Sequence, residues 1–95
     1  MIINDQLEDC KIELFPKTLL RGTPLALDNN MADLAIKDFD NKVQSIRVSG
    51  KCNWTVFRDV GYGGRSQLFL PGEYKNAAMI RTVLRKASSV RNEGC

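Results

Sequence analysis

The sequence predicts an all-β fold, a sandwich of two related Greek-key units of about forty residues each, and two observations support this prediction. Short segments of alternating apolar and polar residues are separated by turn residues at intervals of about 8–12 residues, which is typical of β-sandwiches. The second half of the chain also repeats the first at a spacing of 42–44 residues, as three pairs show: Phe15 and Phe57, Gly22 and Gly64, and Ser45 and Ser89. Units this short cannot bury their own apolar faces, so we expect the two halves to share one core.

Four segments of the first half are predicted to be strands, namely 10–15, 24–27, 32–36 and 44–48. Apolar residues alternate with polar ones in three of them, as in half-buried strands, whereas 32–36 is expected to be a short edge strand. The residues expected to face the core are Ile12, Leu14, Leu25, Leu27, Ile46 and Val48. Residues 1–9 are predicted to be a flexible leader, and the first Greek key is expected over about 10–49.

The second half repeats this order, with strands predicted at 54–57, 66–70 and 88–91. The residues expected to face the core are Trp54, Val56, Leu68, Leu70 and Val90. One segment, 76–87, instead has apolar residues at helical spacing, which predicts a short amphipathic helix before the last strand. The second Greek key is expected over about 53–92, so that residues 10–92 form a single domain.

The composition excludes several classes of function. The chain has 95 residues and a net charge of +3, and no apolar run approaches the about 20 residues of a membrane helix. A basic cluster near the end of the chain, Arg81, Arg85, Lys86 and Arg91, has no interleaved aromatic residue, so we expect no nucleic-acid partner. We also expect no membrane partner, and a monomer or weak homodimer. Histidine is absent, and neither paired carboxylates nor a phosphate-binding loop is recognisable, which predicts that the protein is not an enzyme.

The three cysteines, Cys10, Cys52 and Cys95, have no metal-ligand spacing. Their odd number argues against a closed intrachain disulfide framework and favours a reducing compartment. A cytoplasmic location is therefore expected, which three free thiols in a titration of the native chain would support, and secretion stays open.

Two sets of motifs carry a resemblance to a known family. The second half contains Phe57-Arg-Asp-Val-Gly-Tyr62-Gly-Gly64, Leu68-Phe-Leu-Pro-Gly-Glu-Tyr74 and Ser88-Ser-Val-Arg91. The first half contains Phe15 and Gly22 at the same spacing, followed by Asp40-Asn-Lys-Val-Gln-Ser-Ile-Arg-Val48. Together these motifs resemble the βγ-crystallin Greek-key motif, over about residues 10–91. The likeness is greatest to the single-domain invertebrate and microbial members.

The motif residues are expected to have structural roles. The glycines adopt a backbone conformation closed to other residues, the aromatic pair packs across the folded hairpin, and the serines satisfy backbone groups of the hairpin above them. Leu20 stands where an aromatic residue is usual. The motif residues are Phe15, Gly22, Ser45, Phe57, Tyr62, Gly64, Tyr74 and Ser89.

The resemblance also implies calcium motifs of the form Asn/Asp-Asn/Asp-x-x-Ser/Thr-Ser, once per Greek key, and both copies here are degenerate. The first copy, Asp40-Asn41-Lys42-Val43-Gln44-Ser45, has Gln44 in place of the hydroxyl residue. The second copy, Leu84-Arg85-Lys86-Ala87-Ser88-Ser89, has lost both acidic or amide positions.

In the family each ion draws on both copies, and the two implied sites have decayed unequally. One would join the Asp40 carbonyl, Gln44 and Arg85, and it is expected to be lost because a guanidinium repels a divalent cation. The other would join the Leu84 carbonyl, the Ser88 hydroxyl and the Asn41 amide, which include no carboxylate.

The residue after the first aromatic is often acidic in calcium-binding members, and here it is Pro16 in one copy and Arg58 in the other. Calcium affinity decreases as negatively charged ligands are lost, so we expect weak calcium binding or none. No other cofactor is expected.

The sequence therefore predicts a non-catalytic structural protein that is calcium-independent or binds calcium only weakly. Two alternatives stay open. One is a calcium-binding βγ-crystallin with a single surviving site, and the other is a secreted binding module, such as an inhibitor or toxin, on the same fold.

Overall fold

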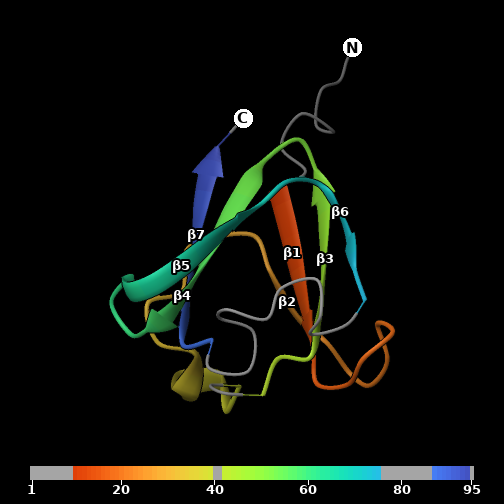
Figure 1. The fold of residues 1–95 in the computed structure, drawn as a ribbon, viewed down its shortest axis with the longest axis horizontal. Helices are drawn as coiled ribbons and strands as arrows, with labels where there is room; N and C mark the ends of the chain where they lie inside the picture. Colours follow the sequence, from red (N-terminus) through yellow and green to blue (C-terminus); the bar gives the residue numbers. More distant parts are fainter. Residues whose placement is uncertain (1–9, 40–41, 76–86, 95) are drawn as a thin grey trace.

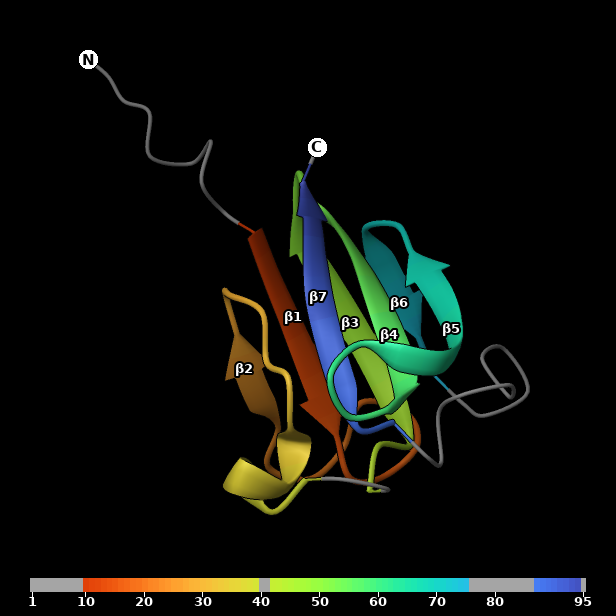
Figure 2. The ribbon, with the colours of Figure 1, turned by 90° about the vertical axis from the view of Figure 1, so that its left-hand side faces the viewer.

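Seven antiparallel strands form two sheets in the computed structural model, which describes residues 10–39, 42–75 and 87–94 (Figures 1 and 2). The four-stranded sheet has the order β2-β1-β3-β6 and contains β1 (Cys10–Phe15), β2 (Leu25–Leu27), β3 (Ser45–Gly50) and β6 (Gly72–Tyr74). The three-stranded sheet has the order β5-β4-β7 and contains β4 (Asn53–Asp59), β5 (Gly63–Phe69) and β7 (Ser89–Gly94). The predicted all-β sandwich is confirmed.

The two halves of the chain exchange strand positions. β6 comes from the second half but pairs with β3 of the first half. In return, Met31 of the first half pairs with Val90 of β7 through two backbone hydrogen bonds of 2.9 and 3.0 Å. Each sheet is therefore completed by the other half, which explains why units of this length fold together.

The core lies between the sheets and is made by the inward faces that alternation predicts. Ile12 and Leu14 of β1 and Ile46 of β3 are fully buried against Trp54 and Val56 of β4. The register of β1 against β3 places the inward side chains side by side, since Ile12 pairs with Val48 and Leu14 with Ile46. Burying a side chain of this size stabilises the fold by about 1.5–3 kcal/mol.

The phase predicted for β5 is wrong. Leu68 and Leu70 are 52% and 55% exposed, whereas Phe69 between them is fully buried. Residues directly opposite in an antiparallel pair lie on one face, and Phe69 pairs with the buried Trp54 while Leu68 pairs with Thr55. Leu25, predicted to be in the core, is only partly buried at its edge.

The edge strand predicted at 32–36 is also wrong. A 3-10 helix spans Leu34–Lys37 instead, and the side chain of Asp33 caps it by accepting a hydrogen bond from the Ala35 N–H at 3.0 Å. Only Leu34 of this helix is buried, and Ile36 is 73% exposed, so the segment has a single anchor rather than an alternating face. This single anchor suits one turn of helix better than a strand.

Two other differences concern the second half. β6 was not expected as a strand, and β7 continues to Gly94 rather than ending at Arg91. Of the helix predicted over 76–87, residues 76–86 lie outside the described residues. The buried Ala87 contacts the core cluster.

Candidate functional site

The hairpin between β4 and β5 folds back over the three-stranded sheet and is fixed by an aromatic pair and a buried serine. The rings of Phe57 and Tyr62 meet edge to face, with their centroids 5.7 Å apart. The fully buried Ser89 donates a hydrogen bond from its hydroxyl to the Asp59 carbonyl at 2.6 Å and accepts one from the Tyr62 N–H at 3.1 Å. The turn also needs left-handed backbone at Tyr62 (φ 64°) and Gly64 (φ 74°).

The hairpin after β1 has the same construction with one aromatic missing. Ser45 donates its hydroxyl hydrogen to the Lys17 carbonyl at 2.6 Å and accepts a hydrogen bond from the Leu20 N–H at 3.0 Å. Leu20 (φ 55°) and Gly22 (φ 86°) have the left-handed backbone of Tyr62 and Gly64. Each of these two hairpins, the first and second corner, is therefore held by a serine hydroxyl that accepts one backbone hydrogen bond and donates another.

We expect Ser89→Ala to lower the free energy of unfolding by about 1–3 kcal/mol, because it leaves the Asp59 carbonyl and the Tyr62 N–H, which are partly buried, without their hydrogen-bond partner. Urea denaturation measures this change. Ser66→Ala on β5 of the same sheet is the matched control, since Ser66 is exposed and its loss should change stability by no more than about 0.5 kcal/mol. Equal effects of the two substitutions would contradict the role given to Ser89.

Gly22→Ala tests the close packing of the first corner. A Cβ at Gly22 would lie 2.7 Å from Cγ of Pro16, and the φ of +86° is unfavourable for alanine. We expect a loss of about 2–3 kcal/mol from backbone strain and overpacking together. Gly61→Ala is the control because Gly61 has a φ of +69° but nothing within 4 Å of such a Cβ, so that its loss should be about 1 kcal/mol. Thermal melts that rank the two variants the other way would contradict the packing argument.

Two arginines whose role was not predicted from the sequence lie over the aromatic rings of the two corners. The guanidinium carbon of Arg91 lies 5.0 Å from the Phe57 ring centroid and 5.8 Å from that of Tyr62, and the guanidinium carbon of Arg47 lies 5.7 Å from the Phe15 centroid. Such contacts stabilise by about 0.5–1 kcal/mol at exposed sites. The signal was present in the sequence, because each corner serine begins a Ser-x-Arg sequence, Ser45 to Arg47 and Ser89 to Arg91.

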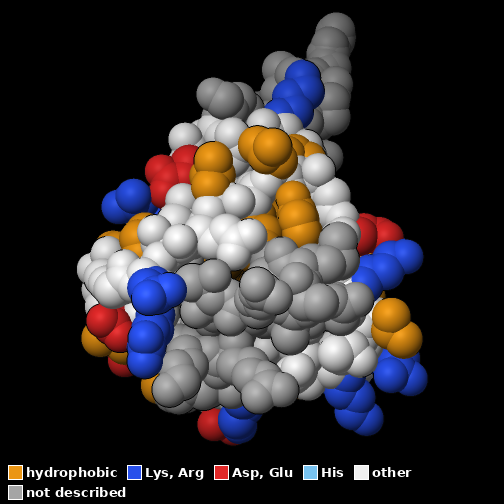
Figure 3. All heavy atoms as spheres, in the orientation of Figure 1, with side chains coloured by type: hydrophobic (Ala, Val, Ile, Leu, Met, Phe, Trp, Pro, Cys, Tyr) orange, Lys and Arg blue, Asp and Glu red, His pale blue; other side chains and the backbone are white. Residues whose placement is uncertain are grey.

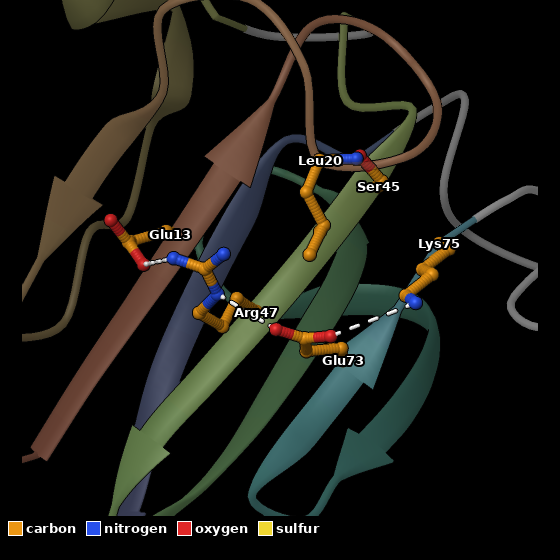
Figure 4. A network of polar contacts seen from close by, with 6 residues as sticks. All are labelled: Glu13, Leu20, Ser45, Arg47, Glu73 and Lys75. Atoms are coloured by element: carbon orange, nitrogen blue, oxygen red, sulfur yellow. Dashed lines mark hydrogen bonds and ion pairs between the residues drawn. The ribbon is translucent and has the colours of Figure 1, made fainter.

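Carboxylates hold both arginines in place. Arg47 lies between Glu13 (3.1 Å) and Glu73 (3.3 Å), its neighbours across the four-stranded sheet, and Lys75 approaches Glu73 at 3.9 Å (Figure 4). Arg91 pairs with Glu93 at 3.1 Å. A hydrogen bond with Thr55 is the main reason that the pKa of Glu93 is lowered, and Arg91 lowers it further. The cations at both corners thus have carboxylate partners within the protein.

The described calcium-motif positions lie next to these corners. The Gln44 N–H donates to the Phe15 carbonyl at 2.8 Å, and the Ser88 N–H donates to the Phe57 carbonyl at 2.9 Å. The fifth motif position therefore adjoins Pro16 in one copy, where the ring carries no charge, and the exposed Arg58 in the other.

The other motif positions, Asp40, Asn41, Leu84 and Arg85, lie outside the described residues. Within 10–39, 42–75 and 87–94, no group of three or more Cys, Asp or Glu residues is placed to hold a metal ion.

Tyr74, the last of the motif aromatics, has a packing role at the sheet edge. Its ring meets Phe69 edge to face at 4.9 Å, and its hydroxyl donates a hydrogen bond to the Leu70 carbonyl at 2.7 Å. Tyr74 thus closes one side of the core over the Phe69 ring.

Cys10 and Cys52 form a disulfide with their Cα atoms 5.0 Å apart, contrary to the argument from the odd cysteine count against intrachain disulfides. An odd number of cysteines leaves one over but does not prevent the other two from pairing. The third, Cys95, lies outside the described residues.

Among the described residues no helix is long and apolar enough to cross a membrane.

Comparisons with known proteins agree with this architecture. The family model described as Beta/Gamma crystallin matches residues 11–92. A protein of Ciona intestinalis described as a beta/gamma-crystallin is 38% identical over 66 residues, which are 70% of this chain and 77% of that protein. The solved structure of a beta gamma crystallin from the same organism superposes with a TM-score of 0.82 at 34% identity, covering 87% of this chain and 99% of the other. A betagamma-crystallin from an archaeon has the same fold, with a TM-score of 0.78 at 20% identity over 87% of this chain and 96% of its own.

Proposed function

Since this chain belongs to the beta/gamma crystallin family, we propose that it is a non-catalytic structural domain whose stability comes from packing and a disulfide rather than from bound calcium. The observation that carries the proposal is that the residue beside the fifth position of each calcium motif carries no negative charge. At the two corners the residue after the aromatic is Pro16 or Arg58, so neither corner offers a carboxylate where calcium needs negative charge.

The contacts at the corners support a structure that is complete without an ion. Ser45 and Ser89 satisfy the backbone of both hairpins, and Arg47 and Arg91 lie over the corner aromatics with their own carboxylate partners. These contacts hold both hairpins through the protein's own side chains.

The proposal extends to partners and catalysis. The lysine and arginine side chains of the described residues are spread over the face in Figure 3 and interspersed with acidic ones, which is unlike the continuous basic surface of a nucleic-acid-binding protein. We therefore propose no nucleic-acid or membrane partner and a monomer or weak homodimer. The relatives are crystallin-type domains, which supports the proposal of no catalytic activity.

The Cys10–Cys52 disulfide favours an oxidising compartment over the cytoplasmic location expected from the cysteine count. It gives a second candidate function, a secreted binding module on the same fold, some support that the sequence did not. A chain isolated from its natural source with Cys10 and Cys52 reduced would argue against this second candidate.

Isothermal titration calorimetry with calcium tests the structural role. We expect no heat of binding at micromolar calcium for the unchanged chain. The variant Leu84→Asp with Arg85→Asn restores the two lost motif positions and is the positive control, which we expect to bind more tightly. Micromolar binding by the unchanged chain would overturn the proposal, and silence of both chains would show that the substituted positions are not what limits binding.

A further inference from the structure

The chain contains one sequence of the form Asn-x-Ser/Thr, namely Asn53-Trp54-Thr55. This is the acceptor sequence, or sequon, for N-linked glycosylation, in which an oligosaccharide is attached to the asparagine side chain of a secretory protein. A sequon this short also occurs by chance, so its surroundings in the fold decide whether it suits a glycan.

The residue before the sequon indicates the compartment. Cys52 forms the disulfide with Cys10. Disulfides form and persist in oxidising compartments, among them the lumen of the endoplasmic reticulum, where N-linked glycans are attached. The disulfide and the sequon are separate chemical features, and both point to this compartment.

The side chain of Asn53 lies on the outer face of the three-stranded sheet, at the start of β4. Trp54 is fully buried and Cys52 is 3% exposed, so the side chain between them points away from the core. Asn53 is partly exposed and follows the exposed residues Gly50 and Lys51. The amide is therefore at the surface at one end of the sandwich.

The strand opposite leaves room for a sugar. Asn53 pairs with Gly94, because β7 ends where β4 begins (Figure 1). Opposite residues of an antiparallel pair share a face, and Gly94 has no side chain. Apart from its chain neighbours, no atom of the described residues lies within 4 Å of a Cβ placed on Gly94. The first sugar on Asn53 therefore meets no side chain from the opposite residue.

We propose that Asn53 is an N-glycosylation site. The side-chain Nδ2 of Asn53 forms a bond to the anomeric carbon of the first sugar, and the bond between this carbon and a lipid diphosphate carrier breaks. The lipid diphosphate leaves with the electron pair, and Nδ2 gives up a proton. The co-reactant is thus a lipid-diphosphate-linked oligosaccharide, and the step consumes no oxidant or reductant.

The burial of Thr55 determines when the transfer takes place. Thr55 is 8% exposed, and its side chain is hydrogen-bonded to that of Glu93 on β7. The hydroxyl of the third residue is part of what the transferase recognises, so the folded chain does not present the complete sequon. β7 follows β4 in the chain and is therefore synthesised later. Transfer thus precedes the pairing of β7 with β4.

Expression of the full chain behind a cleavable signal peptide, in cultured animal cells, tests the site. Trypsin cleaves after Lys51 and Arg58, so Asn53 lies on peptide 52–58. After treatment with peptide-N-glycosidase in heavy-oxygen water, we expect most of the chain to shift to lower mass and this peptide to carry labelled aspartate at position 53. A chain whose signal peptide has been removed but whose Asn53 is unmodified would overturn the proposal.

Two conservative variants are the matched controls. Asn53→Gln keeps an amide but removes the sequon, so we expect no mass shift on deglycosylation. Thr55→Ser keeps both the hydroxyl and the sequon, so we expect the shift to remain. A shift that persists in Asn53→Gln, or one that is lost in Thr55→Ser, would contradict the proposal.

The timing is tested with unmodified chain made in bacteria, to which purified transferase and the lipid-linked donor are added. We expect the reduced, unfolded chain to accept the oligosaccharide and the folded, oxidised chain to be a much poorer acceptor. Equal modification of the two would contradict the argument from Thr55.

The inference rests on the oxidising compartment of the second candidate function, and the two fail in different ways. The added signal peptide supplies the compartment, so an unmodified Asn53 in that experiment counts against the site alone. A chain from the natural source with Cys10 and Cys52 reduced counts against the compartment. A natural chain that has the disulfide but no glycan on Asn53 would overturn the site.

Discussion

Phe69→Ala is expected to lower the free energy of unfolding by about 3–5 kcal/mol, because it removes a fully buried aromatic side chain from the centre of the core. Phe69 pairs with Trp54 across β4 and β5 and meets Tyr74 edge to face, so its loss leaves a cavity lined by two further aromatic residues. Urea denaturation followed by the fluorescence of Trp54, the single tryptophan, measures the change.

Leu68→Ala is the matched control, since Leu68 is the adjacent residue on the same strand but is 52% exposed. Its loss should cost less than about 1 kcal/mol. A larger effect at position 68 than at position 69 would mean that β5 packs in the opposite phase, as the sequence alone predicted.

Removal of the disulfide should have an effect of similar size. The bond closes a loop with a sequence separation of 42 residues, for which the loss of chain entropy on crosslinking corresponds to about 4 kcal/mol. We expect the Cys10→Ser, Cys95→Ser chain to be less stable by this amount than Cys95→Ser alone, as measured by urea denaturation. The comparison keeps position 95 constant, so that Cys95 takes part in no disulfide in either chain.

Equal stability of these two chains would show that the crosslink contributes nothing to the fold. The difference should also disappear when both chains are measured with excess dithiothreitol, because the reductant opens the bond in Cys95→Ser. A difference that persists under reduction would instead reflect packing of the Cys10 side chain.

The sequence predicted best where a strand has one apolar and one polar face. In β1 the order Lys11, Ile12, Glu13, Leu14 admits a single phase, and the structure has that phase. At the end of β5 the run Leu68, Phe69, Leu70 is apolar throughout, so periodicity does not decide which residues face inward. Only the pairing of Phe69 with Trp54 decides this, and pairing is set by the whole sheet.

Short segments were harder for a different reason. Residues 34–36 are apolar, which suggested a strand, but the capping side chain of Asp33 and the left-handed Asp38 (φ 58°) enclose one turn of helix. β6 has three residues and pairs with a strand of the other half, so nothing local marks it. Such elements depend on tertiary contacts that a local pattern does not contain.

In the candidate site, the residues that were recognised as repeated between the two halves could be predicted from the sequence. Residues repeated at the common spacing, such as Ser45 and Ser89, lie where the repeat predicts, below the two hairpins. The arginines share this spacing and were available to the same argument. The disulfide was missed because the number of cysteines was given more weight than their spacing, although Cys10 and Cys52 are themselves equivalent positions.

A thermal melt of the unchanged chain with and without reductant, each in 1 mM calcium and in excess chelator, tests the central claim most directly. A millimolar site would gain only about 0.4 kcal/mol at this calcium concentration, so we expect calcium to raise Tm by no more than about 3 °C. Reductant is expected to lower Tm by well over 10 °C, as the loss of about 4 kcal/mol requires. The opposite result would contradict the account: a rise of more than 10 °C with calcium, about what a micromolar site provides, together with no response to reductant.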